Sequence, residues 1–121
     1  MARTAERIQM GLAALVILGV FSQVYFIASY FFGAGADALD VHKTVGGIVH
    51  GLEVLVFVAA LFAKADRWLA FALAAIGTVQ LALADADKWA GGLHGLFATF
   101  VLLLAAAIVW RARGRSAVAA G

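Results

Sequence analysis

The sequence predicts an all-α integral membrane protein, built as an antiparallel bundle of four transmembrane helices. Three observations lead to this fold class. Of the 121 residues, 65% are hydrophobic and 13% are charged, and the mean hydropathy is +1.01. A soluble domain is roughly 45–50% apolar, and a chain this short has too little interior to hide so much apolar surface from water. The apolar residues also form four long runs, and the charged residues lie at the ends of those runs.

Each apolar run is close to the length that spans a bilayer as a helix, which is about 20 residues. The runs cover residues 8–33, 41–63, 68–84 and 89–110. Because the stretches between them are short, consecutive helices are expected to be antiparallel, in an up-down-up-down order. We therefore expect one four-helix transmembrane domain over residues 1–112 and a flexible cytoplasmic tail over residues 113–121.

The distribution of basic residues predicts how the bundle is oriented. Most of them lie at one set of helix ends: Arg3, Arg7, Lys64, Arg67, Arg111, Arg113 and Arg115. Only Lys43 and Lys88 lie at the opposite ends, among aspartates. Positive residues remain on the cytoplasmic side, so we expect both termini in the cytoplasm and a multi-pass protein of the inner (cytoplasmic) membrane. This topology also accounts for the pI of about 9.4, so no nucleic-acid partner is expected.

Three histidines carry the strongest functional signal. Ionisable residues at membrane depth are costly and by default mark a functional site. His42 and His50 lie in the second run and His94 in the fourth, and these two helices are diagonal in an up-down-up-down bundle. Imidazoles at matched depth on diagonal helices can bind the iron of one haem from opposite faces. Counting from the basic helix ends slightly favours His50 as the partner of His94 over His42, a margin that helix tilt can remove.

Small and polar residues beside the histidines add to the candidate site. The glycines leave room for a flat ring near the backbone, although close helix packing also favours small residues. The lysines could pair with haem carboxylates or extend to lipid headgroups. The glutamines could bond a histidine or join helices. These candidates are Gly46, Gly47, Gly91, Lys43, Lys88, Gln23 and Gln80.

Glu53 follows His50 by three residues and so shares a helix face with it. Such a pair near the middle of a membrane span could relay protons or fix the helix register. With the three histidines it could in principle form a zinc site. The chain also contains an internal echo, because "HKTVGGIVHGL" in the second run resembles "DKWAGGLHGL" at the start of the fourth.

The motifs resemble those of haem A synthases. His42-Lys43-x-x-Gly46 is similar to the start of the second helix of these enzymes, and "LHGLFATFVLLLA" is similar to the fourth helix of each half. The glutamines in "FSQVYF" and "TVQLAL" fit the preceding helices. The chain resembles one four-helix half over nearly its whole length, and it is closer still to a family of short bacterial four-helix membrane proteins of unassigned activity. The resemblance implies His42 and His94 as axial ligands. His50 has no counterpart in the matched pattern, and it stays open as a residue that supports the ligands or as the alternative ligand.

The departures from this pattern bear on the activity. Leu39 stands three positions before His42, where haem A synthases carry an acidic residue, and there is no cysteine to match their cysteine pair. The resemblance therefore favours a haem-binding electron carrier over an enzyme that oxidises haem, and no catalytic residue is assigned.

The sequence as a whole predicts a small membrane cytochrome b that acts in electron transfer or haem handling. It would hold one haem b without covalent attachment, because there is no cysteine. Besides the lipid bilayer and haem, the expected partners are a quinone or respiratory protein and a second copy of the chain. The alternatives are a non-redox accessory or assembly subunit and a small transporter, each with a structural or proton-handling His/Glu set.

Overall fold

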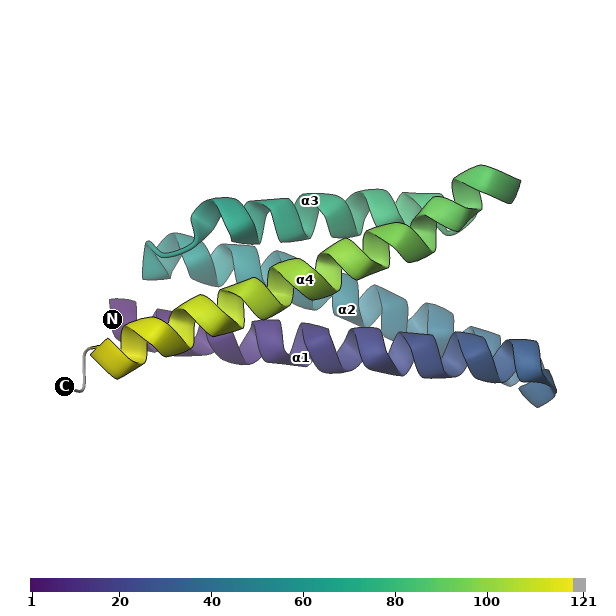
Figure 1. Ribbon diagram of the computed structural model, residues 1–121, viewed down its shortest axis with the longest axis horizontal. Coiled ribbons are helices and arrows are strands. Elements are labelled where there is room, and N and C mark those ends of the chain that lie inside the picture. Colours follow the sequence, from purple (N-terminus) through teal and green to yellow (C-terminus); the bar gives the residue numbers. More distant parts are fainter. Residues whose placement is uncertain (119–121) are drawn as a thin grey trace.

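Four long α-helices make up almost all of the computed structural model, in which residues 1–118 are described (Figure 1). They are α1 (Ala2–Ser29), α2 (Ala36–Ala63), α3 (Arg67–Leu83) and α4 (Lys88–Val118). A short π-helical turn, η1 (Tyr30–Ala34), follows α1. No strand occurs within residues 1–118, so the expected all-helical fold is confirmed.

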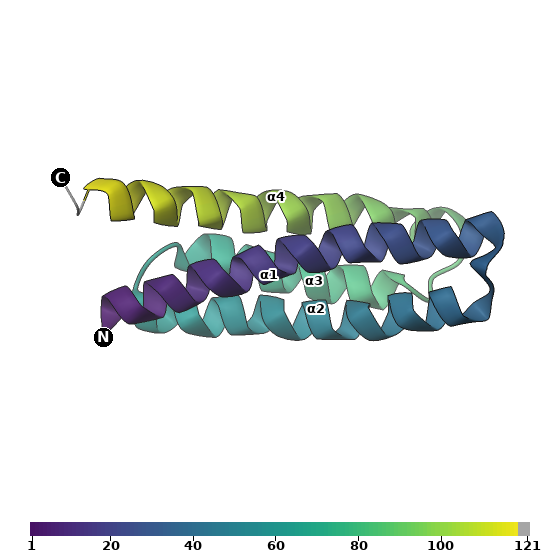
Figure 2. The same ribbon diagram turned by 90° about the horizontal axis from the view of Figure 1, so that it is seen from below.

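The helices run alternately in opposite directions along one bundle (Figures 1 and 2). We call the end that holds the start of α1, the α2–α3 turn and the end of α4 the terminal end, and the end that holds η1 and the α3–α4 turn the loop end. Each helix contacts its two neighbours around the bundle, and in the described chain no Cα atoms of the diagonal pairs α1–α3 and α2–α4 lie within 8 Å of each other. Short connections between antiparallel helices produce this neighbour order.

Three of the helical segments are long and apolar enough to cross a membrane: α1 continued by η1, α2 and α4. The fourth, α3, is equally apolar but has only 17 residues. Large apolar side chains such as Leu18, Phe62 and Leu103 are exposed on the outside of the bundle. An exterior of this kind suits contact with lipid, as expected for helices that are long and apolar enough to cross a membrane.

The connection from α1 to α2 is much shorter than the sequence suggested. Instead of a loop, η1 and Gly35 reverse the chain, and α2 already begins at Ala36. Gly33 and Gly35 have φ angles of 94° and 82°, a left-handed conformation that glycine adopts without the steric cost of a side chain. Asp37 and Asp40 therefore lie in the first turns of α2 rather than in a loop.

The expectation of a flexible tail is wrong for residues 113–118, because α4 continues as a helix to Val118. Ala112 is buried in this last part of the helix, and Arg115 forms ion pairs with Asp66 and Glu6. These contacts stabilise turns that would fray if they were solvated on all sides. Residues 119–121, the rest of the expected tail, lie outside the described residues.

The buried core occupies only the half of the bundle nearest the terminal end. Its members are alanines and valines with one leucine and one isoleucine: Ala13, Val16, Val20, Val49, Val56, Ala60, Ala70, Leu73, Val101, Ala105 and Ile108. Toward the loop end, beyond Val20, Val49, Gly77 and Val101, no residue of the described helices is buried. The helices are therefore closely packed in one half of the bundle and loosely packed in the other.

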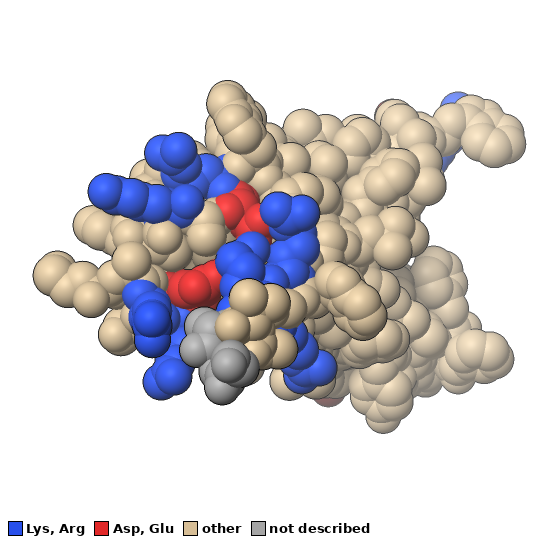
Figure 3. Space-filling view, turned by 60° about the vertical axis from the view of Figure 1, so that its left-hand side comes forward, with Lys and Arg blue, Asp and Glu red and all other residues tan. Residues whose placement is uncertain are grey.

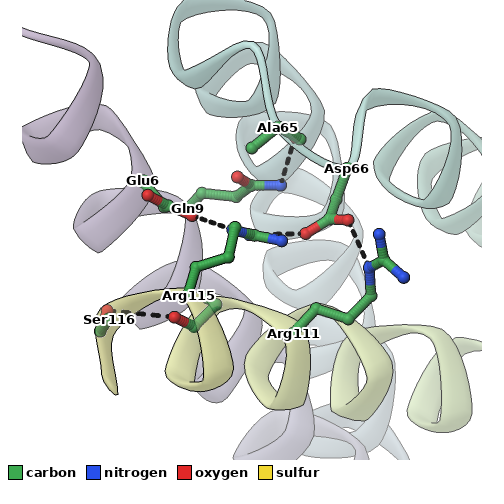
Figure 4. Close-up of polar contacts among 8 residues, drawn as sticks. Glu6, Gln9, Ala65, Asp66, Arg111, Arg115 and Ser116 are labelled. Atoms are coloured by element: carbon green, nitrogen blue, oxygen red, sulfur yellow. Dashed lines mark hydrogen bonds and ion pairs between the residues drawn. The ribbon is translucent and has the colours of Figure 1, made fainter. Parts of the chain in front are cut away.

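A network of charged side chains closes the terminal end (Figure 4). Asp66, in the α2–α3 turn, accepts a hydrogen bond of 2.6 Å from Arg111 Nε and lies 2.7 Å from Arg115 Nη2. Arg115 Nε also donates to Glu6 on α1. The Asp66 side chain is only 2% exposed. The surrounding lysines and arginines form a basic surface at this end (Figure 3). The network thus joins α1, α4 and the α2–α3 turn.

The charge of Asp66 should make stability depend on pH. Burial alone would raise the pKa of Asp66, but hydrogen bonds and charges from Arg115 and Arg111 outweigh burial and lower it. The ion pair therefore stabilises the fold fully above the unfolded-state pKa of about 3.9 and loses this effect as the pH falls through the lower folded-state value. Asp66→Asn should reduce the unfolding free energy at pH 7 by about 1–3 kcal/mol, and the deficit should shrink in strong acid. Thermal unfolding in detergent between pH 7 and pH 3 measures this, with the exposed Asp37→Asn as the matched control.

The close packing of α1 on α2 can be tested at two glycines of α1. A Cβ atom at Gly19 would lie 2.3 Å from Val49 Cγ2, whereas one at Gly11 would meet nothing within 4 Å. Gly19→Ala should therefore lower the unfolding free energy by about 1–3 kcal/mol through overpacking, and Gly11→Ala should be neutral or stabilising because alanine favours a helix. Equal effects of the two substitutions in thermal unfolding would contradict this packing.

Candidate functional site

His42 and His94 face each other in the loosely packed half of the bundle. Their ring centroids are 6.2 Å apart and their planes are inclined by 65°. His42 projects from α2 and His94 from α4, the diagonal helices whose described Cα atoms stay more than 8 Å apart. Both side chains are half-buried. The two imidazoles therefore reach toward each other across the space between the helices.

The two rings are held by matching hydrogen bonds. His42 Nδ1 lies 3.0 Å from the backbone oxygen of Gln23 on α1, and His94 Nδ1 lies 2.9 Å from the backbone oxygen of Gln80 on α3. A carbonyl oxygen can only accept, so each Nδ1 must carry a proton and donate it. In the neutral ring the lone pair is then on Nε2, the nitrogen available to a metal. Histidines that bind metals are commonly oriented by such a bond to a backbone carbonyl.

The Gln23 side chain fastens α1 to α2 at the same level. Its Nε2 donates a hydrogen bond of 2.6 Å to the backbone oxygen of His42. Gly46 lies beside it, and a Cβ atom there would be 3.3 Å from Gln23 Oε1. Gln23 and His42 thus exchange bonds in both directions, each side chain with the backbone of the other residue. Gln80 itself lines the space beside the histidines.

Two cavities adjoin the histidine pair, with volumes of about 240 Å³ and 370 Å³. Both are lined by Val20, Gln23, His42, Lys43, Gln80, Ala84, His94 and Ala98. The smaller cavity extends toward α2 and α3 and is also lined by His50, Glu53 and Gly77. The larger one extends toward α1 and α4, where Ile27 and Leu102 line it. Ligand-binding cavities typically measure about 300–1,000 Å³, so the space is of that order.

Most, but not all, of the candidate residues come together here. His42, His94, His50, Lys43, Gly46, Gln23 and Gln80 line the smaller cavity. Lys88, Gly47 and Gly91 line neither cavity. A Cβ atom at Gly91 would lie 2.6 Å from the backbone oxygen of Ala86, so this glycine permits the tight α3–α4 turn, while Gly47 faces open space.

His42, not His50, lies against His94, contrary to the slight preference from counting residues. Counted from Arg111, His94 lies nearer the level of His50 than that of His42, but Arg115, one turn further along α4, also contacts Asp66. Taking Arg115 as the reference brings His94 to the level of His42. His50 instead lies 3.0 Å, through Nδ1, from Glu53 Oε2.

Sequence analysis missed the contact between Glu53 and Gly77. Glu53 is 1% exposed, and a Cβ atom at residue 77 would lie 1.6 Å from its Oε2 atom. The glycine in α3 therefore makes space for a carboxyl group from α2. The only signal in the sequence was a single glycine within the third apolar run, and its register against Glu53 depends on how the two helices pack.

Within residues 1–118, no three His, Cys, Asp or Glu side chains cluster in a way that could hold a metal ion. The zinc site considered from the sequence is therefore not assembled in this part of the chain. Comparisons with protein-family models, curated proteins and solved structures found no match to the chain. The functional assignment consequently depends on the geometry of the site.

The protonation pattern of the two rings can be checked directly. We expect the neutral His42 and His94 to carry their proton on Nδ1, because each Nδ1 lies opposite a carbonyl oxygen. Heteronuclear NMR of isotope-labelled histidine in the purified protein distinguishes the two tautomers. Gln23→Leu keeps the backbone carbonyl and should leave the His42 tautomer unchanged. A proton on Nε2 of either ring would contradict the arrangement.

Proposed function

We propose that this protein is a small membrane cytochrome of the b type, which holds one non-covalent haem between His42 and His94. The observation that carries this proposal is the pair of facing imidazoles, each with Nδ1 bonded to a carbonyl and Nε2 available. Two protein ligands are too few for a zinc ion. They suffice for haem iron, because the porphyrin supplies the remaining ligands.

The separation of the rings supports the same ligand. Bonds from a metal to imidazole nitrogen are about 2.0–2.1 Å long, so two imidazoles on opposite sides of one iron atom have their centres roughly 6 Å apart. The measured separation is 6.2 Å. The motifs that resemble haem A synthases imply the same two histidines.

The surroundings also fit a flat, mostly apolar ring with acidic substituents. The half of the bundle that contains the histidines has no buried residue toward the loop end within the described helices, and Gly46, Ala84 and Ala98 present little side chain to the space. Lys43 lines both cavities and is itself exposed, so it is suited to pair with a haem carboxylate.

Bound haem would supply one-electron redox chemistry. If His42 and His94 both bound the iron, they would leave it no free position, which would favour electron transfer over reaction with oxygen. The chain's own residues would then hold and orient the ring rather than catalyse a reaction. The basic surface at the terminal end supports a location in the inner (cytoplasmic) membrane, with both termini in the cytoplasm. A quinone or a respiratory protein is the kind of partner that this role requires. A second copy of the chain would give a dimer of eight helices, which resembles the two four-helix halves of haem A synthases.

Haem binding is tested by expressing the full chain in haem-replete cells and recording the spectrum of the purified protein. We expect a low-spin spectrum with a sharp Soret band and resolved α and β bands on reduction. His42→Ala and His94→Ala should each abolish the low-spin spectrum, because each removes one axial ligand.

His50→Ala is the matched control, since it removes an imidazole from the same cavity without touching the proposed ligands. This variant should keep the low-spin spectrum. Colourless protein that also fails to take up added haemin would overturn the proposal, and loss of the spectrum in His50→Ala but not in His42→Ala would reassign the ligand.

A further inference from the structure

The proposed haem site makes no use of Glu53, a buried acidic residue. Glu53 is 1% exposed and belongs to α2, one of the helices long and apolar enough to cross a membrane. A carboxylate without compensation is costly in such a place, and ionisable residues within membrane spans generally have a functional partner. The partner of Glu53 is His50, whose Nδ1 lies 3.0 Å from Oε2.

The fold makes room for this pair. A Cβ atom at Gly77 on α3 would lie 1.6 Å from Glu53 Oε2 and 2.5 Å from Cδ, so a side chain at residue 77 would displace the carboxyl group. A glycine in the middle of a helix costs roughly 0.5–1 kcal/mol relative to alanine. The packing of α2 on α3 therefore accommodates the carboxyl group at some cost to the helix.

The pair also shares a cavity with the proposed iron ligands. His50 and Glu53 line the smaller cavity together with His42 and His94. The other titratable groups on its wall are Lys43 of α2 and Asp85 of the α3–α4 turn, both exposed near the loop end. From α1 the lining residues are Val20 and Gln23, neither of which titrates. The cavity thus extends from exposed groups to the buried pair.

We propose that His50 and Glu53 form a proton-binding site coupled to electron transfer at His42 and His94. This inference rests on the proposed function. When a one-electron reductant delivers an electron to the haem site, the His50–Glu53 pair takes up one proton from water through the cavity. When the electron leaves, the proton returns to water. One electron and one proton enter and leave together, so the net charge inside the apolar bundle is unchanged.

The coupling is measured by spectroelectrochemical titration of the haem-loaded protein between pH 5 and pH 9. We expect the reduction equilibrium to become less favourable as the pH rises, by up to tenfold per pH unit, which corresponds to about 59 mV for one electron. Glu53→Gln keeps the shape of the side chain but removes the acid, and should abolish the dependence. Asp85→Asn removes a carboxylate from the exposed end of the same cavity and should retain it.

A second measurement needs no substitution. Reduced-minus-oxidised infrared spectra of the unaltered protein should contain a carboxyl signal that shifts in heavy water. A potential that does not change with pH, a dependence unchanged in Glu53→Gln, a dependence lost in Asp85→Asn, or the absence of the carboxyl signal would each overturn the inference.

Failure of this inference can be told apart from failure of the proposed function. Protein that binds haem with a low-spin spectrum but shows no pH dependence retains the function and loses the proton site. Protein that binds no haem loses the function. In that case an infrared pH titration of the haem-free chain, compared with Glu53→Gln, still reports whether Glu53 exchanges a proton.

Discussion

Close packing in the terminal half of the bundle is the constraint on which the rest of the structure depends. Alanine and valine dominate the buried core, and small side chains allow helices in a membrane to approach closely. The ion pairs of Arg115 with Glu6 and Asp66 fix the end of α4 near α1, whereas the bond of His94 to Gln80 fixes its beginning near α3. As Figure 1 shows, α4 therefore crosses the bundle obliquely. Helices held this firmly at one end can leave space at the other without collapsing into it.

The site combines two similar half-sites, one from each helical hairpin. In the first hairpin His42 of α2 bonds to a carbonyl of α1, and in the second His94 of α4 bonds to a carbonyl of α3. Each imidazole is thus oriented by its own hairpin, and packing of the hairpins brings the two rings together, with their planes inclined by 65°. The internal echo in the sequence is misleading here, because its shared His-Gly-Leu tripeptide aligns His94 with His50. The hydrogen bonds instead make His42 the counterpart of His94.

Sequence patterns were sufficient for the features that depend on composition. Long apolar runs separated by charges predicted four helices, and histidines in alternate runs predicted that α2 and α4 bring two imidazoles close together. They failed where the result depends on register between helices. The length of α4 depends on Arg115 meeting Asp66, which lies 49 positions earlier in the chain. The space for Glu53 depends on Gly77 lying opposite it. The connection from α1 to α2 is shorter than the loop that composition alone suggested, because Gly33 and Gly35 adopt positive φ angles that reverse the chain.

The placement of His50 and Glu53 on the same helix as His42 has an electrostatic consequence. His50 follows His42 by eight residues, which is about 12 Å along an α-helix. That distance is too long for a bond between the groups. Two unit charges 12 Å apart still interact by about 1.4 kcal/mol at an effective dielectric constant of 20, enough to change a proton-binding constant about tenfold. In bulk water the interaction would be about fourfold weaker. An electron at a haem held by His42 and His94 would therefore act on a proton at the His50–Glu53 pair through the electrostatic field within the bundle, without direct contact.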